Sequence, residues 1–538
     1  MPIAVRPAPP ATAVTKTAPL EGVHLVNSAK PHTNGHAATA FTEARLSKPP
    51  DPLLLAYSIT PELEREKLQF SQYVSIDLAH LIMLVDQGIV TPEVARPILR
   101  ALLDVRARGL DGLHIDAGKG TLLLQIEAAL VDVLGEDIAG SLHTGRSRID
   151  QGGTARRLYK RDRLLEVMSH LTAFQRVVLD AAARYRDQLI PFYTHMQQAQ
   201  PGNFGHYLLA FADRLHDDFE RCAEALRRAN RNPLGSVGLS GTSWPIDRTR
   251  TSQLLGFDSV LDNSKLAREA YYAAEIATAL SFVMATLNDL ATDLHVWCSN
   301  EFSTISLDDS FCSTSSIFPQ KKNPVALESV RAAAGPAVSW GAAALATFRG
   351  EGTGDQALRS VPLLDAAFVT TMNALDLTGG VLSTLRVNTQ RIDQLLAATW
   401  STSSNLADEL VKTKGYSFRQ AHHVVARMVR LAEEGSISRS VVTPSLLARA
   451  AEQTIGEAIE IGEAELLRAL DPHEFVETRT STGAVCPAEV DKLMQRCERD
   501  VEADEQWLHV KVVHVNGAEE ELEQSVLALL ARGEEVTV

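Results

Sequence analysis

Long runs of helical periodicity are the feature that most constrains the fold of this chain. Apolar side chains recur three and four positions apart over 164–178 and again over 204–226, and a third run extends from Leu266 to about Phe302. The second run alone predicts a helix of roughly six turns. We therefore expect an all-α protein built around long helices.

Helical periodicity also occurs earlier in the chain, over about 51–140. A helix there is expected to begin near Thr91, where a capping residue precedes a proline. Residues 1–50 are rich in Pro, Ala, Thr and Ser, and we interpret them as a disordered extension and not as a signal peptide. The Gly335-Pro336 pair predicts a kink in the helix that contains it.

These patterns predict a division of the chain into domains. The expected parts are an N-terminal helical domain over 51–140, a central helix-bundle domain over 141–390, and a C-terminal helical domain over 391–504. The remaining tail, 505–538, combines a strand-like run at 508–515 with an amphipathic helix pattern at 519–530. The sequence indicates no role for this tail.

Charge and cysteine content limit the function classes. The formal net charge of −15 argues against nucleic acid or an anionic membrane as a general partner. Charged residues interrupt the longest apolar stretches, so we expect no membrane span. The five cysteines form no C-x-x-C pair, which favours a reducing compartment such as the cytoplasm and argues against a zinc or iron–sulfur centre. An anionic substrate would therefore need a locally basic pocket.

Residues 314–324 (Thr-Ser-Ser-Ile-Phe-Pro-Gln-Lys-Lys-Asn-Pro), here called the signature segment, are polar and lie between two long helical patterns. Asn323 is a good N-cap and Pro324 a good first helical residue. A helix start offers free N–H groups, and Lys321 and Lys322 add positive charge, so the segment suits an anion.

Two adjacent hydroxyls, Ser315 and Ser316, belong to the same segment. Either could act as a base or nucleophile, but only if its proton were made easy to lose. The alternative for a lone serine or lysine pair is a solvated basic turn.

A second unusual stretch is 141–151, here called the arginine segment, which precedes a long helix. Arg148 offers a bidentate clamp for a carboxylate, and Ser147 offers a hydrogen-bond donor. The alternative is a charged helix start with Asp150 near the cap.

A third polar stretch is 192–201, here called the histidine segment. A single histidine such as His195 is usually structural, but Thr194 and Gln197 flank it and make a binding site more plausible.

Together these segments resemble the argininosuccinate lyases of the fumarase/aspartase superfamily. The signature segment is similar to the superfamily loop Gly-Ser-Ser-x-Met-Pro-x-Lys-x-Asn-Pro, with Thr314 in place of Gly and Phe318 in place of Met. The arginine segment resembles His-Thr-Gly-Arg-Ser-Arg-Asn-Asp, with Ile149 in place of Asn. The histidine segment resembles Gly-Tyr-Thr-His-Leu-Gln-Arg-Ala-Gln-Pro, and 403–434 resemble the family's C-terminal block.

This resemblance implies a three-domain all-α subunit with a long central helix bundle. It also implies a homotetramer in which each active site takes segments from three chains, because one bundle could not easily bring all three together. The implied reaction is a β-elimination that releases fumarate from a small dicarboxylate, without a metal or an organic cofactor.

The resemblance further implies a role for each site residue. Ser315 would be the base, and Lys321 would help to stabilise its alkoxide. His195 would lie near the leaving nitrogen, and Glu328 would orient this histidine. The residues implied to bind substrate are Ser147, Arg148, Thr194, Gln197 and Asn323.

Departures from the family pattern bear on the substrate. Argininosuccinate lyases have Tyr, Gln and Lys side chains that contact the arginine part, but 352–360 here read Gly-Thr-Gly-Asp-Gln-Ala-Leu-Arg-Ser. An upstream Glu-Asp-x-His element is replaced at 120–123 by Gly-Thr-Leu-Leu. Each lost contact should cost roughly a few kcal/mol of binding free energy.

We therefore predict a carbon–nitrogen lyase that acts on an N-substituted aspartate or related succinate, with a leaving group other than arginine. One alternative is a genuine argininosuccinate lyase of arginine biosynthesis. The other, of a different class, is a catalytically inert, crystallin-like structural protein.

Overall fold

The computed structural model describes residues 48–349 and 363–531. The extension predicted at the N-terminus lies outside the described residues up to position 47, and so does the whole run 352–360. Regular structure in the described ranges is overwhelmingly helical, which confirms the all-α prediction.

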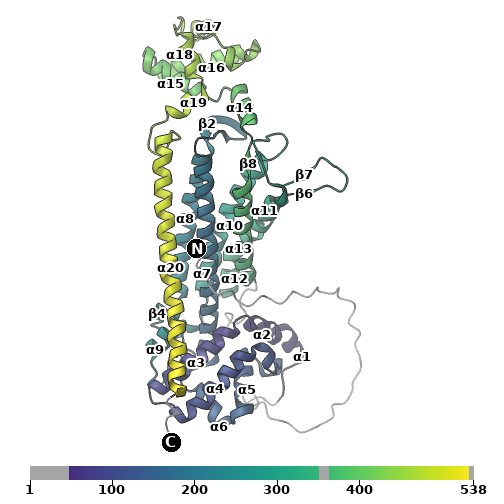
Figure 1. Ribbon diagram of the computed structural model, residues 1–538, viewed down its shortest axis with the longest axis vertical. Helices are drawn as coiled ribbons and strands as arrows, with labels where there is room; N and C mark the ends of the chain where they lie inside the picture. Colours follow the sequence, from purple (N-terminus) through teal and green to yellow (C-terminus); the bar gives the residue numbers. More distant parts are fainter. Residues whose placement is uncertain (1–47, 350–362, 532–538) are drawn as a thin grey trace.

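Short and medium helices form the N-terminal part of the molecule, at the bottom of Figure 1. They are α1 (Pro52–Leu54), α2 (Thr60–Lys67), α3 (Phe70–Asp86), α4 (Pro92–Arg108), α5 (Leu122–Leu134) and α6 (Glu136–Ala139). α4 begins directly after Thr91, as predicted. Leu78, Leu81 and Ile82 all point into one buried apolar core, which confirms the helical spacing read from the sequence.

Long helices form the central bundle and run side by side along the long axis of the molecule (Figure 1). They are α7 (Arg148–Arg184), α8 (Phe204–Ala229), α10 (Tyr271–Trp297) and α13 (Leu363–Thr384). A short helix, α9 (Arg248–Leu254), lies between α8 and α10 in the sequence. Side chains of the long helices form one continuous buried cluster.

The third predicted run is shorter than expected, because α10 covers only Tyr271–Trp297. Before it, Ser264–Arg268 form a 3-10 turn. After it, the chain reverses at Ser303, whose φ is 53°, and the N–H of Thr304 bonds back to the carbonyl of Trp297 at 3.0 Å.

The kink predicted at Gly335-Pro336 is confirmed as a break between two helices. α11 (Val325–Ala337) ends one residue after Pro336, and α12 (Trp340–Phe348) follows. A proline lacks the N–H that would continue the helical ladder, so the chain turns there.

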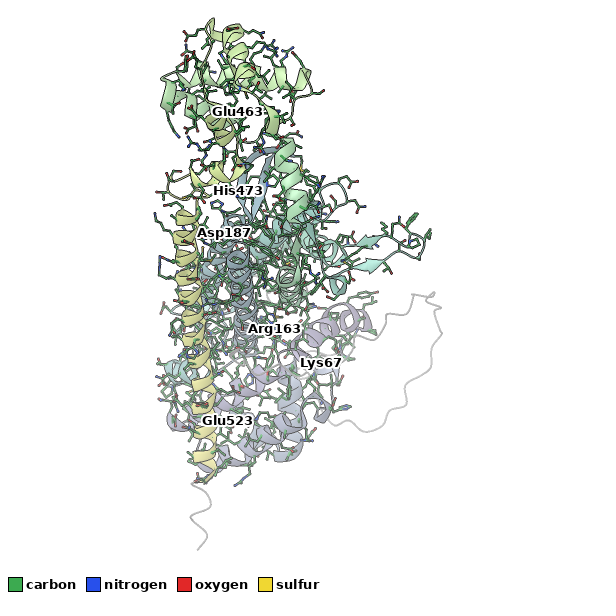
Figure 2. All side chains as sticks on the ribbon, turned by 45° about the horizontal axis from the view of Figure 1, so that its top comes forward. Lys67, Arg163, Asp187, Glu463, His473 and Glu523 are labelled. Atoms are coloured by element: carbon green, nitrogen blue, oxygen red, sulfur yellow. The ribbon has the colours of Figure 1, made fainter. Side chains whose placement is uncertain are left out.

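The C-terminal lobe lies at the top of Figure 1 and has an apolar core of its own. Its helices are α15 (Ser403–Lys414), α16 (Phe418–Glu434), α17 (Pro444–Ile455) and α18 (Glu463–Ala469), with α14 (Thr389–Ala398) and α19 (Pro472–Glu477) at the junction with the bundle. Figure 2 shows Glu463 within this lobe and His473 at the junction.

The strand predicted at 508–515 is wrong, because these residues belong to one 45-residue helix, α20 (Pro487–Ala531). This helix packs along α7 and α8 and reaches α3 and α4, and Figure 2 places Glu523 near its far end. Leu508 and Val512, four positions apart, face the bundle, whereas Val510 and Val513 are exposed. Packing against the bundle therefore overrides the strand preference of valine. Residues 505–531 of the predicted tail and the end of the predicted C-terminal domain are parts of this single helix.

Short strand pairs occur in the loops. β1 (Leu189–Thr194) pairs with β2 (Gln197–Asn203), β3 (Arg231–Asn232) with β4 (Ser259–Val260), β5 (Ile305–Ser306) with β8 (Arg386–Val387), and β6 (Ser313–Thr314) with β7 (Lys322–Asn323). All are antiparallel except β3 with β4.

Within the described ranges, none of the helices taken singly has the length and apolar character needed to cross a membrane. The bent pair Pro52–Lys67 and Phe70–Asp86, at 76° to each other, meets that criterion only when the two are combined.

Candidate active site

The arginine segment ends at the start of α7. Ser147 is the N-cap, and it forms a capping box with Asp150, to which its hydroxyl donates at 2.7 Å. Arg148 is the first helical residue and is exposed. Asp150 also accepts the backbone N–H groups of Gly235 at 2.8 Å and Val237 at 3.2 Å. The local structure is therefore the charged helix start of the alternative interpretation, with Asp150 near the cap. In this arrangement the side chain of Arg148 is exposed to solvent.

A buried polar network holds the arginine segment against α3 and α5. Arg146, whose side chain is fully buried, donates to Asp77 at 2.6 Å and lies 3.6 Å from Glu127. Gln151 donates to the same oxygen of Asp77 at 2.7 Å. Burial raises the pKa of Asp77, although the positive charge of Arg146 opposes that shift. The sequence analysis did not find this network, because its members are far apart along the chain.

His80 of α3 also contacts the arginine segment. Its Nε2 lies 2.8 Å from the carbonyl of Thr144, and its side chain is fully buried. Burial, reinforced by the nearby charge of Arg146, lowers the pKa of His80 to about 3. This imidazole is therefore neutral and donates its Nε2–H to the carbonyl.

The histidine segment forms a β-hairpin that the sequence analysis did not predict. Thr194 ends β1, Gln197 begins β2, and the two pair across the turn. His195 and Met196 make the two-residue connection with φ of 55° and 59°. Such φ values usually select Asn or Gly, so the dipeptide gave no hairpin signal. Thr194, His195 and Gln197 are all exposed at the tip.

The signature segment is an exposed loop that closes the short β6–β7 ladder. It projects sideways from the bundle in Figure 1. The Ser315 Oγ accepts the backbone N–H groups of Ile317 at 3.2 Å and Phe318 at 3.0 Å. Ile317 is 76% exposed. Ser315 is thus the hydroxyl on which the N–H groups of the loop converge.

Asn323 is not the N-cap that the sequence predicts. It lies in β7, paired with Ser313, and its amide donates to the Ser313 hydroxyl at 3.4 Å. Pro324 occupies the cap position and helix α11 begins at Val325. The ladder with β6 holds Asn323 in an extended conformation, which overrides its capping preference.

The two lysines of the signature segment differ in their surroundings. Lys322 pairs with Asp309 at 2.6 Å and donates to the carbonyl of Leu307 at 2.6 Å. The hydrogen bond that Lys322 donates to the Asp309 carboxylate raises the pKa of Lys322. Lys321 is exposed, and its ammonium has no ion pair or hydrogen bond among the described residues. Lys322 therefore fixes the base of the loop and Lys321 remains available.

Glu328 lies on the exposed face of α11. Its carboxylate is 4.0 Å from Nε2 of His295, and Arg331 lies 2.7 Å from Nδ1 of the same ring. Within one chain Glu328 thus faces His295, and no contact with His195 is recorded among the described residues.

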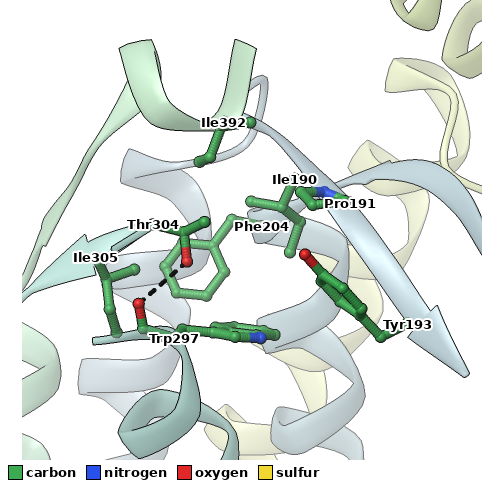
Figure 3. Close-up of a pocket in the computed structure, with 8 residues that line it drawn as sticks. All are labelled: Ile190, Pro191, Tyr193, Phe204, Trp297, Thr304, Ile305 and Ile392. Atoms are coloured by element: carbon green, nitrogen blue, oxygen red, sulfur yellow. Dashed lines mark hydrogen bonds between the residues drawn. The ribbon is translucent and has the colours of Figure 1, made fainter. Parts of the chain in front are cut away.

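The hairpin and the signature segment lie at the same end of the bundle. Figure 3 shows a small cavity, with room for about one water molecule, that is bordered by Tyr193 of β1 and by Thr304 and Ile305. The signature segment follows Ile305 closely in the sequence, so it leaves the bundle beside the base of the hairpin. Phe302, three residues before Ile305, packs against Tyr193 with the two rings tilted and their centroids 5.5 Å apart.

The arginine segment lies at the opposite end. Ser147 precedes α7 and the hairpin follows it, and α7 has 37 residues, which corresponds to a length of about 55 Å. No hydrogen bond or ion pair among the described residues joins Ser147, His195 and Ser315. A single chain therefore separates the predicted carboxylate clamp from the predicted base.

An open cleft of about 620 Å³ lies between the hairpin and the C-terminal lobe. It was not found from the sequence, because its walls come from four separate segments. Its lining residues are Tyr193, Met196, Gln197, Gln198, Ala199, Glu301, Phe302, Leu395, Ala398, Thr399, Trp400, Ser401, Ser403, Val429 and Glu433.

In the part of the chain that the structure describes, His, Cys, Asp and Glu side chains form no group of three or more that could hold a metal ion. Cys222, Cys298, Cys312, Cys486 and Cys497 are all unpaired there.

Comparisons with known proteins agree with the fold. A family profile described as Lyase matches residues 60–338, and another, described as Argininosuccinate lyase C-terminal, matches 400–477. The argininosuccinate lyase of Methanocaldococcus jannaschii is 33% identical over 464 residues, which cover 86% of this chain and 94% of that protein. Argininosuccinate lyase 1 of Shouchella clausii is 32% identical over 469 residues, with coverage of 86% and 94%.

Two solved structures of EDDS lyase also match most of this chain. EDDS lyase in complex with formate is 31% identical and matches with a TM-score of 0.82 over 91% of this chain and 98% of that one. An EDDS lyase variant with bound fumarate matches with a TM-score of 0.81 at 31% identity over the same shares.

A helical bundle that carries these three segments, together with relatives of this similarity, defines a lyase of the carbon–nitrogen type. The chain belongs to the fumarase/aspartase superfamily, as one of its argininosuccinate lyase-like members.

Proposed function

We propose that this protein eliminates fumarate from an N-substituted aspartate or related succinate whose leaving group is not arginine. The observation that carries the proposal is the convergence of the Ile317 and Phe318 N–H groups on the Ser315 hydroxyl. Backbone N–H groups fixed around an oxygen stabilise its anionic form, which is the form that a serine needs to act as a base.

In the proposed mechanism Ser315 removes a proton from the carbon next to a substrate carboxylate. The resulting carbanion spreads its charge into that carboxylate, and Lys321 and Asn323 stabilise this charge. His195 lies near the departing nitrogen, where a proton is delivered as the C–N bond breaks. Glu328 of a neighbouring chain orients this histidine. Ser147 and Arg148 hold the remote carboxylate, with Thr194 and Gln197 contributing further contacts.

We propose a homotetramer, because the clamp and the base lie about one α7 length apart in a single chain. A face of the bundle formed by α10, α12, α13 and the turn between α11 and α12 supports this assembly. It exposes the large apolar residues Phe282, Val338, Leu345 and Val369, with exposed fractions between 46% and 76%. An exposed apolar face of this kind is typical of a protein–protein interface. An antiparallel neighbour packed there brings its arginine segment to the hairpin end of the first chain.

Three departures support a leaving group other than arginine. Leu123, which replaces the histidine of the family's Glu-Asp-x-His element, is buried in the N-terminal core and offers no polar group to a ligand. Ile149 replaces an asparagine in the first turn of α7. The run 352–360 lacks the arginine-contacting side chains of the family pattern. The likeness to EDDS lyase, 31% identical over 91% of this chain, supports a succinyl substrate with a different amine.

A genuine argininosuccinate lyase remains the second candidate, since the curated relatives at 31–33% identity bear that name. An inert, crystallin-like role is disfavoured, because a scaffold would not require Ser315, Lys321, Asn323, His195 and Glu328 together. We place the enzyme in the cytoplasm, which suits five unpaired cysteines.

The test is fumarate release from a panel of argininosuccinate, aspartate, adenylosuccinate, nitrosuccinate, EDDS and other diamine-linked succinates, followed by ultraviolet absorbance. We expect turnover of at least one N-substituted aspartate and little turnover of argininosuccinate. Argininosuccinate as the best substrate would refute the proposed leaving group and leave the reaction class intact. No fumarate from any compound would overturn the reaction itself.

A further inference from the structure

The cleft between the β1–β2 hairpin and the C-terminal lobe has a composition unlike that of the dicarboxylate clamp. Two carboxylates, Glu301 and Glu433, line it, and no lysine, arginine or histidine does. Both glutamates are exposed, and neither has an ion pair among the described residues. Arg391 lies close by, but its guanidinium donates to the backbone carbonyls of Glu301 and Phe302. Two carboxylates in the lining against one nearby guanidinium leave the cleft with an excess of negative charge.

Aromatic and aliphatic side chains form the rest of the wall. Tyr193, Phe302 and Trp400 present rings, and Leu395 and Val429 present aliphatic surface. Aromatic faces attract cations through the ring quadrupole, and carboxylates attract them by their charge. A volume of about 620 Å³ is in the range of small-molecule sites. This combination suits an aliphatic chain that ends in an ammonium group, and it repels a carboxylate.

The cleft is continuous with the hairpin that carries His195. Met196 and Gln197, which follow His195 directly, both line it. The far wall is tied to the hairpin by the Thr399 hydroxyl, which donates to the Gln198 side chain at 2.9 Å. The cleft therefore lies next to the position that a group departing near His195 would occupy.

We propose that the cleft is the subsite for the leaving group, and that this group is an aliphatic amine carrying a second positive charge. Glu301 and Glu433 pair with the distal ammonium, and Trp400 covers the intervening chain. This inference rests on the proposed function, since it assigns the other end of the same substrate. It adds residues of the C-terminal lobe to those that determine substrate specificity.

Two synthetic substrates of matched length test the proposal in catalysis. N-(aminobutyl)aspartate places an ammonium in the cleft, and N-pentylaspartate places a methyl group at the same position. We expect a higher kcat/KM for the charged compound. Glu301→Gln and Glu433→Gln should each lower that value about fivefold, as expected for partly exposed ion pairs, and should leave the kcat/KM for N-pentylaspartate unchanged.

Glu434→Gln is the matched control. Glu434 is adjacent to Glu433 but pairs with Arg430 at 2.9 Å and does not line the cleft. This variant should behave as the wild type with both substrates. Equal rates for the two substrates, or equal losses in all three variants, would overturn the subsite while fumarate release still supported the reaction.

A binding measurement keeps the test independent of turnover. Isothermal titration calorimetry of the full chain should show that putrescine binds and that its affinity falls about fivefold in each of the two cleft variants. Butanediol, which has the same length but no charge, should show no comparable binding. Putrescine that fails to bind, or that binds the double variant Glu301→Gln/Glu433→Gln as tightly as the wild type, contradicts the inference whether or not any substrate is turned over.

Discussion

The backbone N–H of Phe318 lies 3.0 Å from the Ser315 hydroxyl oxygen and donates to it. The N–H of Ile317 joins it at 3.2 Å. Ser315 is half-buried and the neighbouring Ser316 is exposed, and the Ser316 hydroxyl has no such partners among the described residues. The geometry of the loop therefore favours Ser315, the serine to which the family resemblance also assigns the role of base.

Ser315→Ala should reduce fumarate release by about 10²–10⁴-fold, because it removes the proposed base. Ser316→Ala should have a much smaller effect, since it leaves the two N–H donors and Ser315 in place. Initial rates with the best substrate of the panel, and circular dichroism to confirm folding, provide the measurement. Equal losses in the two variants would contradict the assignment of the base.

The stability of the protein should depend on pH through His80. Its pKa is lowered to about 3, chiefly by burial, whereas in the unfolded chain the ordinary value near 6.5 applies. Between these values the unfolded chain binds a proton that the folded chain does not. Stability is therefore lost as the pH falls from about 6.5 towards 3, at up to about 1.4 kcal/mol for each pH unit.

Denaturant titrations at several pH values measure this effect. His80→Gln keeps a donor for the Thr144 carbonyl and should flatten the slope relative to the wild type. His114→Gln, on the exposed surface, serves as the control and should keep the wild-type slope. A His80→Gln protein with an unchanged slope would count against the neutral imidazole.

Leu522→Ala should lower the free energy of unfolding by about 2–4 kcal/mol, as is usual for a buried leucine. Leu522 is 3% exposed and lies in the N-terminal core, where the far end of α20 packs. Glu520→Ala, on the exposed face of the same helix, should have little effect. Chemical denaturation compares the variants, and equal stabilities would mean that this end of α20 does not hold the N-terminal part.

Leu345→Asp should dissociate the proposed tetramer and reduce activity. Leu345 is 52% exposed on α12, and a charge there would be buried without a partner if four chains packed on this face. Val133→Asp, at a 69% exposed apolar position on α5, is the control. Light scattering after gel filtration gives the mass of each variant, and an unchanged mass for Leu345→Asp would exclude this face as the interface.

Much of the fold followed from the sequence because apolar spacing records burial directly. Leu78, Leu81 and Ile82 are fully or almost fully buried on α3, and the break after Pro336 follows from a missing backbone donor. The strand predicted for the valine-rich run of α20 was wrong because these residues pack against α7 and α8, which are far away in the sequence.

The candidate site was only partly predictable. The resemblance identified the segments, but local capping preference misassigned Asn323, which a ladder with Ser313 holds in β7. The hairpin at His195 lacks the usual turn residues. The buried pair of Asp77 and Arg146 depends on contacts between distant positions, which a single sequence does not reveal.

The most direct test of the account is complementation between two inactive variants, because the account assigns the clamp and the base of each site to different chains. Arg148→Ala and Ser315→Ala proteins are prepared separately, then mixed, unfolded and refolded together, and fumarate release is measured. Mixed tetramers contain some sites with both native residues, so we predict that activity returns only in the mixture. Mixed tetramers that form but release no more fumarate than either parent would contradict the account.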